Sequence, residues 1–234
     1  MKQYKNNGGR FVNDVLGSIK QRRYSLNHGR YRSWEDCYNA FRSVYNKGFS
    51  MNDTEFLALH LAGYLASWGM YRGSSDLLRE YSYLVHKDLI PLLYNSKYLS
   101  LFDIDENNFE QNLQLIESAY SEIEVFYNAL ICNNKQFKAS ETLVTKIMLG
   151  VYGCIPAYDR FLREGLKYYE IQKSGKNKFG ALSEWLNNNP DFVSDIIAYG
   201  KASFNNYPFM KLVDMCFWEL GWRLIEKNNK EVVK

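Results

Sequence analysis

Apolar residues recur every three or four positions along almost the whole of this 234-residue chain. The clearest example follows Asn108, where one face of a helix would carry Leu113, Ile116, Tyr120, Ile123, Phe126 and Leu130. This spacing is typical of amphipathic helices, whereas a half-buried strand alternates apolar and polar residues. Because no alternating segment of useful length occurs, the sequence predicts an all-α fold.

Glycines and prolines indicate where the expected helices begin and end. Gly48 should stop an N-terminal helix, and residues 56–70, FLALHLAGYLASWGM, should follow as a central buried helix because they are apolar around most of its circumference. Residues 76–90 should form the next helix, interrupted near Pro91. Later helices are expected to begin at or just after Pro156, Pro190 and Pro208.

No stretch of the chain has the character of a membrane span or a secretory signal. An uninterrupted apolar run of roughly 18 residues is absent, and the N-terminal MKQYKNNGGRF lacks the apolar core of a signal peptide. Four cysteines are widely scattered without a C-x-x-C pair: Cys37, Cys132, Cys154 and Cys216. They indicate buried thiols rather than disulfides or zinc ligands, so we expect a cytoplasmic protein with no membrane partner.

Charge is distributed unevenly along the chain. Residues 1–47 contain ten Lys and Arg against three Asp and Glu, and aromatic residues interleave with the basic ones in KQRRYSLNHGRYRSWEDCYNAFR. Because cations attract phosphates and aromatic rings stack, this block indicates a nucleic-acid partner. Residues 103–124 contain seven Asp and Glu and no Lys or Arg, which predicts a solvated helix face or a surface for another protein.

Familiar catalytic motifs are missing from the sequence. There is no G-x-G-x-x-G, Walker-type loop, G-x-S-x-G or H-E-x-x-H, and the histidines at positions 28, 60 and 86 share no ligand spacing. These absences weigh against NTPases, serine hydrolases and zinc enzymes. The remaining function classes are an enzyme that uses a carboxylate and a protein that only binds a partner.

One carboxylate has a suggestive position, in ETLVTKIMLGVYGCIPAYDRFLREGLKYY, residues 141–169. An apolar helix should end near Gly153 and a second helix should open at Pro156, which places Asp159 in its first turn. Unpaired N–H groups and the helix dipole favour a charged carboxylate there. Asp159 is therefore either a residue that caps the helix or one that stabilises developing positive charge or activates water.

The core of this stretch, TLVTKIMLGVYGCIPAYDRFLREGL, resembles the helix-hairpin-helix DNA glycosylase superfamily. Those enzymes have a hairpin, a helix ending near a glycine, a short apolar turn and an Asp that opens the next helix. Gly153, CIPAY and Asp159 match the last three parts. The resemblance implies an all-helical fold of two lobes and cleavage of an N-glycosidic bond in double-stranded DNA with a flipped base. It implies Asp159 as the catalytic residue.

At the hairpin position the chain reads QFKASET, without the glycines of the family's hairpin. The chain also lacks the iron–sulfur cysteines that some members of the family have. Ser140 should cap the following helix, and Lys138 should supply charge for a phosphate. Lys146 lies about one turn later than the family's nucleophilic lysine, so we expect a monofunctional enzyme with no metal or cofactor. The expected DNA contacts are Lys138, Ser140, Lys146, Lys176, Lys178, Arg22 and Arg23.

A second stretch, LASWGMYRGSSDLL, has the residues that a flipped base requires. An extruded base needs an aromatic ring to stack on and polar groups at its edge. Trp68 or Tyr71 would stack, while Arg72, Ser74 and Asp76 would bind the edge. The other interpretation is a corner between two helices, with glycines for close packing and serines for capping.

The resemblance favours one two-lobed, monomeric helical domain over residues 1–234. Its expected parts are basic N-terminal helices, a helical lobe, a degenerate hairpin with the Asp-bearing helix, and C-terminal helices, in residues 1–50, 51–135, 136–172 and 173–234. The leading hypothesis is a DNA glycosylase that removes a damaged or modified base, in DNA repair or in defence against foreign DNA. The alternatives are a non-catalytic helical nucleic-acid-binding protein and a protein-binding module that uses the acidic segment.

Overall fold

The computed structural model describes residues 8–25, 31–71, 77–132, 134–171, 177–204 and 207–232. These segments are mostly helical, with one hairpin of two-residue strands, so the prediction of an all-α fold is confirmed. The chain forms two compact units. Unit 1 comprises Met1–Asn27, Asp105–Leu113 and Ile155–Lys234, and unit 2 comprises His28–Ile104 and Gln114–Cys154. No helix in the described segments has both the length and the hydropathy for a membrane crossing.

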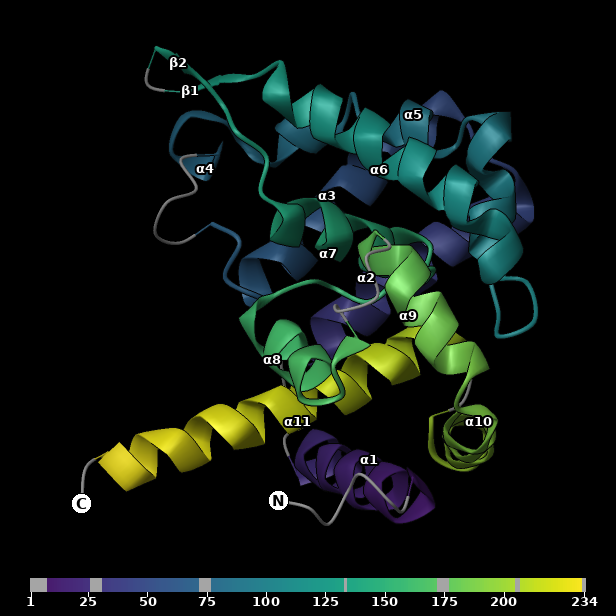
Figure 1. The fold of residues 1–234 in the computed structure, drawn as a ribbon. Coiled ribbons are helices and arrows are strands. Elements are labelled where there is room, and N and C mark those ends of the chain that lie inside the picture. The colour runs from purple at the N-terminus through teal and green to yellow at the C-terminus, as the bar shows by residue number, and fades with distance from the viewer. Residues whose placement is uncertain are drawn as a thin grey trace. The chain divides into compact units, whose positions relative to one another are not determined.

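Unit 1 is built around its C-terminal helix, which is buried from Phe209 to Gly221. An N-terminal helix, whose Phe11 and Val15 are buried, packs against it, and Figure 1 shows the two helices next to each other. The helices of this unit are α1 (Gly8–Ser25), η4 (Glu110–Asn112), α8 (Arg160–Tyr168), α9 (Lys178–Asn187), α10 (Pro190–Ser203) and α11 (Phe209–Val232).

The most extensive helix packing in unit 1 joins α8 to α11, and two glycines make it possible. A Cβ on Gly165 would overlap the backbone carbonyl of Phe217, and a Cβ on Gly221 would overlap the carbonyl of Phe161. The two backbones therefore touch in a way that no residue with a side chain allows. This contact fixes the start of α8 against α11.

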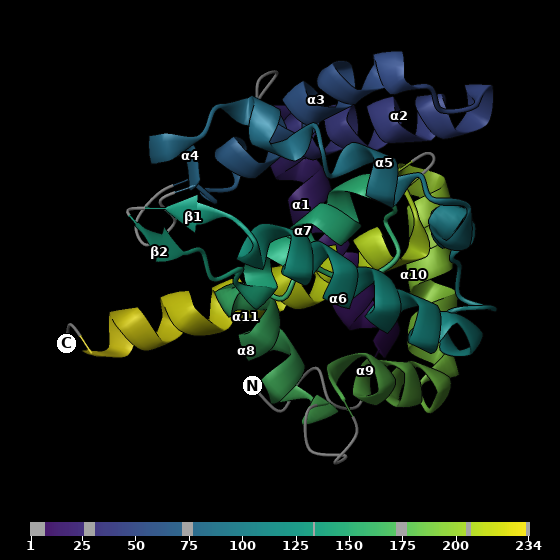
Figure 2. The same cartoon turned by 90° about the horizontal axis from the view of Figure 1, so that it is seen from above.

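Unit 2 is built around α7 (Glu141–Val151), whose residues from Leu143 to Val151 are all buried. Helices α2 and α3 pack against α7 and against each other, and Figure 2 shows α2 and α3 side by side. The other elements of the unit are α2 (Tyr31–Lys47), η1 (Met51–Asp53), α3 (Thr54–Ser67), α4 (Leu77–Glu80), η2 (Tyr83–His86), α5 (Ile90–Leu93), η3 (Ser96–Asp103), α6 (Leu113–Asn128), β1 (Ile131–Cys132) and β2 (Lys135–Gln136). The first residue of α6 belongs to unit 1.

Two expectations about helices are wrong. Residues 56–70 do not form the central helix, because α3 exposes about half of Phe56 and Leu59 (51% and 55%) and α7 occupies the centre instead. Residues 76–90 do not form one helix either. They divide between α4, η2 and the start of α5, and Pro91 lies in the first turn of α5, where its missing N–H costs no hydrogen bond.

Candidate active site

The turn before α8 differs from the helix that Pro156 predicted. Residues 154–158 are buried and irregular, and α8 begins only at Arg160. Asp214 Oδ1 on α11 accepts a hydrogen bond from the Ala157 N–H at 3.0 Å, which ties this turn to α11. Asp159 therefore precedes the helix in an extended conformation (φ −88°, ψ −179°), whereas the sequence placed it inside the first turn.

The Asp159 carboxylate is held by three N–H groups. Its Oδ1 accepts hydrogen bonds from the backbone of Phe161 and of Leu162, both at 3.0 Å, so the side chain is the N-cap of α8. Its Oδ2 accepts the indole N–H of Trp218 at 3.1 Å. Contacts on both oxygens fix the orientation of the group.

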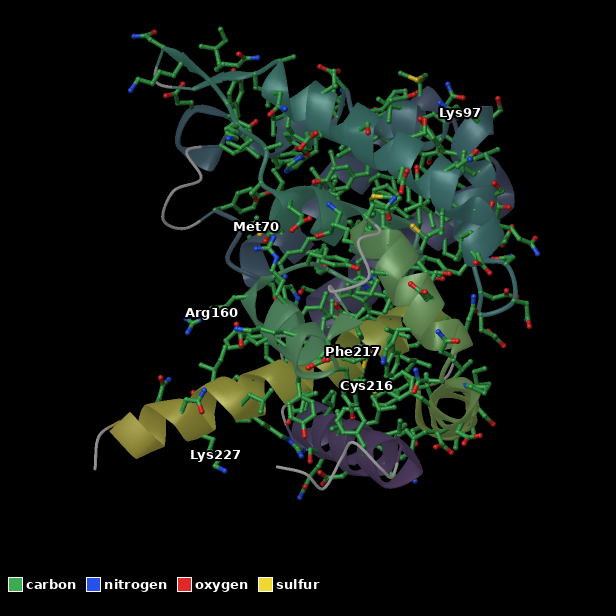
Figure 3. All side chains as sticks on the ribbon, in the orientation of Figure 1. Met70, Lys97, Arg160, Cys216, Phe217 and Lys227 are labelled. Atoms are coloured by element: carbon green, nitrogen blue, oxygen red, sulfur yellow. The ribbon has the colours of Figure 1, made fainter. Side chains whose placement is uncertain are left out.

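Aromatic rings adjoin this carboxylate. The Trp218 ring lies 5.0 Å from that of Phe161 in an edge-on arrangement, and Phe161 and Asp159 are both half-buried. Figure 3 labels Arg160, which is exposed at the first position of α8, and Phe217, which is buried on α11 beneath Gly165. A charged oxygen pair with an apolar ring on one side is thus accessible at the N-terminus of α8.

A buried ion pair on α11 lies next to the turn at residues 154–158. Lys211 and Asp214 lie one turn apart on α11, with Nζ to Oδ2 at 3.0 Å and exposures of 3% and 5%. Removing either partner would leave an uncompensated buried charge. Sequence analysis missed both residues, although charged residues within the apolar run FMKLVDMCFWEL were a signal that could have found them.

Farther along α11, Glu219 is fully buried and accepts a hydrogen bond from Arg223 Nε at 2.9 Å. The same guanidinium donates to Asp14 Oδ2 at 2.6 Å and to the hydroxyl of Ser18 at 2.7 Å, both on α1. These contacts join α1 to α11 and were also not predicted.

The residues expected to bind a flipped base lie in unit 2. Trp68 ends α3, where the Lys146 ammonium lies 5.1 Å from its ring centroid and Tyr31 packs against its edge. Tyr71 is half-buried, and its hydroxyl is 2.7 Å from His86 Nε2. Arg72, Ser74 and Asp76 lie outside the described residues.

His86 is the centre of a buried polar chain that the sequence did not indicate. It is fully buried, and its Nδ1 lies 2.6 Å from the hydroxyl of Tyr127. Burial lowers the pKa of His86 to about 4, so the ring is neutral at pH 7, and burial raises the pKa of both Tyr71 and Tyr127. Because a neutral ring has one donor and one acceptor nitrogen, one tyrosine donates to it and the other accepts from it.

The residues that were predicted to contact DNA phosphates lie in different environments. Ser140 caps α7 through a hydrogen bond from the Leu143 N–H at 3.1 Å, as predicted, and Lys138 just before it is exposed. Lys178 is the first residue of α9 and lies over the rings of Phe179 and Tyr158.

The four other predicted DNA contacts are Lys146, Lys176, Arg22 and Arg23. Lys146 is 4% exposed, because it lies on the buried face of α7, so it does not share the surface position of Lys138. Lys176 lies outside the described residues. Arg22 and Arg23 belong to α1, but their side chains are outside the described part of the structure.

The basic N-terminal block is largely engaged with its own surroundings where the structure describes it. Ion pairs join Arg32 to Asp36 at 2.8 Å and Lys47 to Asp53 at 2.7 Å, and Arg42 pairs with a carboxylate of η3 at 2.9 Å. Several of the described aromatic residues of the block are buried. Trp34 is buried, stacks on Tyr38 and donates its indole N–H to the Leu149 carbonyl. These two rings are therefore buried in unit 2 and are not exposed for stacking on nucleic acid.

The thiols of Cys37, Cys154 and Cys216 are free and buried, as expected, and burial raises their pKa. Over the described residues, no three His, Cys, Asp or Glu side chains are grouped so as to hold a metal ion. Comparison with protein-family models, curated proteins and solved structures finds no match to this chain.

Proposed function

We propose that the chain is a DNA N-glycosylase in which Asp159 is the catalytic carboxylate. The observation that carries the proposal is the set of three N–H groups around Asp159, from Phe161, Leu162 and Trp218. Cleavage of an N-glycosidic bond develops positive charge on the sugar. A carboxylate whose charge and orientation are fixed beforehand stabilises that charge without reorganising during the reaction.

The neighbouring residues have supporting roles in this proposal. Trp218 is a positioning residue, because its N–H fixes the second oxygen of Asp159. Asp214 holds the turn before α8 through the Ala157 N–H, and Lys211 neutralises Asp214. The half-buried ring of Phe161 supplies an apolar surface beside the carboxylate.

Water is the proposed nucleophile. In the reaction the bond from C1′ to the base nitrogen breaks, a water oxygen bonds to C1′, and the departing base takes up the proton that water loses. Lys146 is the lysine nearest in sequence to the family's nucleophile, but it is buried over the ring of Trp68. The product is therefore an intact strand with an abasic site. The substrate is double-stranded DNA with a flipped, damaged or modified base, and binding of that base by Trp68 and Tyr71 remains a prediction.

A specific observation also favours the alternative, a non-catalytic helical nucleic-acid-binding protein. The contacts of Asp159 with Phe161 and Leu162 are those of any N-cap aspartate, and such a residue needs no catalytic role. The two hypotheses differ in one respect. A binding protein leaves every base in place, whereas a glycosylase leaves abasic sites.

The test is a screen of the purified chain against duplexes that each contain one modified or damaged base. The proposal predicts alkali-sensitive strand breaks at one class of base, and no covalent adduct after borohydride treatment. A borohydride-trapped adduct that disappears in a Lys146→Met variant would transfer the nucleophile to Lys146. Duplex binding without breaks at any base would support the non-catalytic alternative.

A further inference from the structure

Unit 1 contains a cavity that is separate in its residues from the Asp159 cluster. It has a volume of about 670 Å³ and lies between the segment 106–111 and helices α9 and α10. Its lining includes the apolar residues Phe109, Leu186, Val193 and Ile197 together with several polar residues. Cavities of this size that combine apolar side chains with polar groups are typical binding sites for small molecules.

The charged residues of this cavity have a single sign. Glu106 and Glu110 line it, and no Lys, Arg or His belongs to the lining in the described part of the chain. Glu110 is held in place because its Oε2 accepts a hydrogen bond from Asn187 Nδ2 at 2.9 Å. Both glutamates belong to the acidic segment 103–124, which the proposed glycosylase chemistry does not use.

Ser183 on α9 adds a hydroxyl group to this lining. The lining therefore combines apolar side chains, a hydroxyl and two carboxylates. Such a combination suits a ligand with a polar group on an apolar body.

We propose that this cavity binds a small amphipathic cation, namely a primary ammonium group attached to an apolar or aromatic body. The apolar body packs on Val193 and Ile197, and the ammonium group lies at the carboxylates of Glu106 and Glu110. Hydrogen bonds between ions of opposite charge are shorter and stronger than neutral ones, which gives the site its selectivity for a cation. This inference does not depend on the proposed glycosylase activity.

Three probes of similar size and different charge test the proposal: phenethylamine, 2-phenylethanol and phenylacetate. Isothermal titration of the full chain at low salt should rank the affinities in that order. In a Glu106→Gln, Glu110→Gln double variant, phenethylamine should bind about fivefold to tenfold more weakly, because an exposed carboxylate contributes modestly to an ion pair. The affinity for 2-phenylethanol should stay the same.

Two control variants locate the effect. A Glu164→Gln, Glu226→Gln double variant removes the same charge elsewhere in unit 1 and should leave phenethylamine binding unchanged. Ala198→Trp, which fills the cavity from α10, should abolish binding of phenethylamine and 2-phenylethanol while the thermal melt stays intact. Undetectable phenethylamine binding at millimolar concentration, equal affinity for all three probes, or unchanged binding in Ala198→Trp would each overturn the proposal.

Discussion

Asp159 in unit 1 and His86 in unit 2 are both titratable groups fixed by hydrogen bonds, yet they differ in their access to solvent and in their partners. Asp159 is half-buried, and its carboxylate accepts hydrogen bonds from the N–H groups of Phe161, Leu162 and Trp218. His86 is fully buried between two hydroxyls, and burial lowers its pKa to about 4. Asp159 is thus accessible at the start of a helix, whereas His86 is a neutral group of the interior.

This difference distinguishes Asp159, a candidate catalytic residue, from His86, a polar residue of the core. A charge that stabilises a developing cation has to be both present and accessible before the reaction. A buried neutral imidazole instead satisfies the hydroxyls of Tyr71 and Tyr127 and fixes how they pack. We therefore propose a catalytic role for Asp159 and a structural role for His86, and the following predictions test that division.

The largest expected effect comes from separating α8 from α11. Gly165→Ala and Gly221→Ala each place a methyl group onto a backbone carbonyl, so each should lower the free energy of unfolding by about 3 kcal/mol or more. Gly63→Ala on the exposed side of α3 is the matched control, because its new methyl group meets no atom within 4 Å. It should change stability by at most about 1 kcal/mol, in the stabilising direction. Urea unfolding measures both, and equal effects would contradict the packing described.

The next effect is the pH dependence caused by His86. Its pKa falls from 6.5 in the unfolded chain to about 4 in the folded one, so the unfolded state binds the proton first. Stability should therefore decrease as the pH falls below 6.5 and continue to decrease down to about 4, by about 3 kcal/mol in total.

The control for this prediction is His86→Gln, which keeps a donor and an acceptor but does not titrate. Its unfolding free energy should be nearly flat between pH 6.5 and 5. Asp53 and Glu122 have a lowered pKa, and their contributions are lost only at more acidic pH. Equal slopes in wild type and variant over this interval would show that His86 is not the group responsible.

A smaller effect is expected from the second oxygen of Asp159. Trp218→Phe removes the indole N–H but keeps an aromatic ring against Phe161, so excision should slow about tenfold without a change in fold. Trp185→Phe makes the same chemical change in an aromatic cluster with Tyr169 and Phe217. Single-turnover rates should be unaffected by that control, and equal rates in all three proteins would remove the positioning role of Trp218.

The smallest effect concerns the phosphate contacts. Lys138→Ala and Lys178→Ala should each reduce the slope of log affinity against log salt by about 0.9, because each removes one released counterion. Lys146→Met should leave the slope unchanged, since Lys146 is buried on α7. Fluorescence anisotropy with a short duplex measures all three slopes, and a reduced slope in Lys146→Met would mean that α7 moves on binding.

Local patterns predicted much of the helical structure. Periodicity identified α6 and α11, and glycines with positive φ end α2 at Gly48 and follow α7 at Gly153. The same approach failed where burial depends on distant segments. It placed α3 at the centre, because apolar composition does not tell which of two apolar helices is covered by others.

The candidate site was only partly predictable for the same reason. Asp159 was found because an Asp after a short apolar turn near a helix start is a local pattern, although it precedes α8 and does not lie inside its first turn. Its partner Trp218 lies 59 residues away in the sequence, and the close contact of Gly165 with Phe217 depends on how two helices cross. Nor does any local pattern show that Lys146 is buried over Trp68. Such pairings are set by tertiary packing.

The central claim is that the charge of Asp159, and not its capping contact, drives base excision. Asp105 provides a matched control, because its Oδ1 also accepts two backbone N–H groups, from Asn107 and Asn108. The decisive measurement is the single-turnover excision rate of Asp159→Asn and Asp105→Asn on the duplex identified in the screen. The account predicts a loss of two or more orders of magnitude for Asp159→Asn alone, about 2.7 kcal/mol or more of transition-state stabilisation, with DNA affinity and melting temperature preserved. An undiminished rate in Asp159→Asn would leave Asp159 as a helix cap and contradict the proposed mechanism.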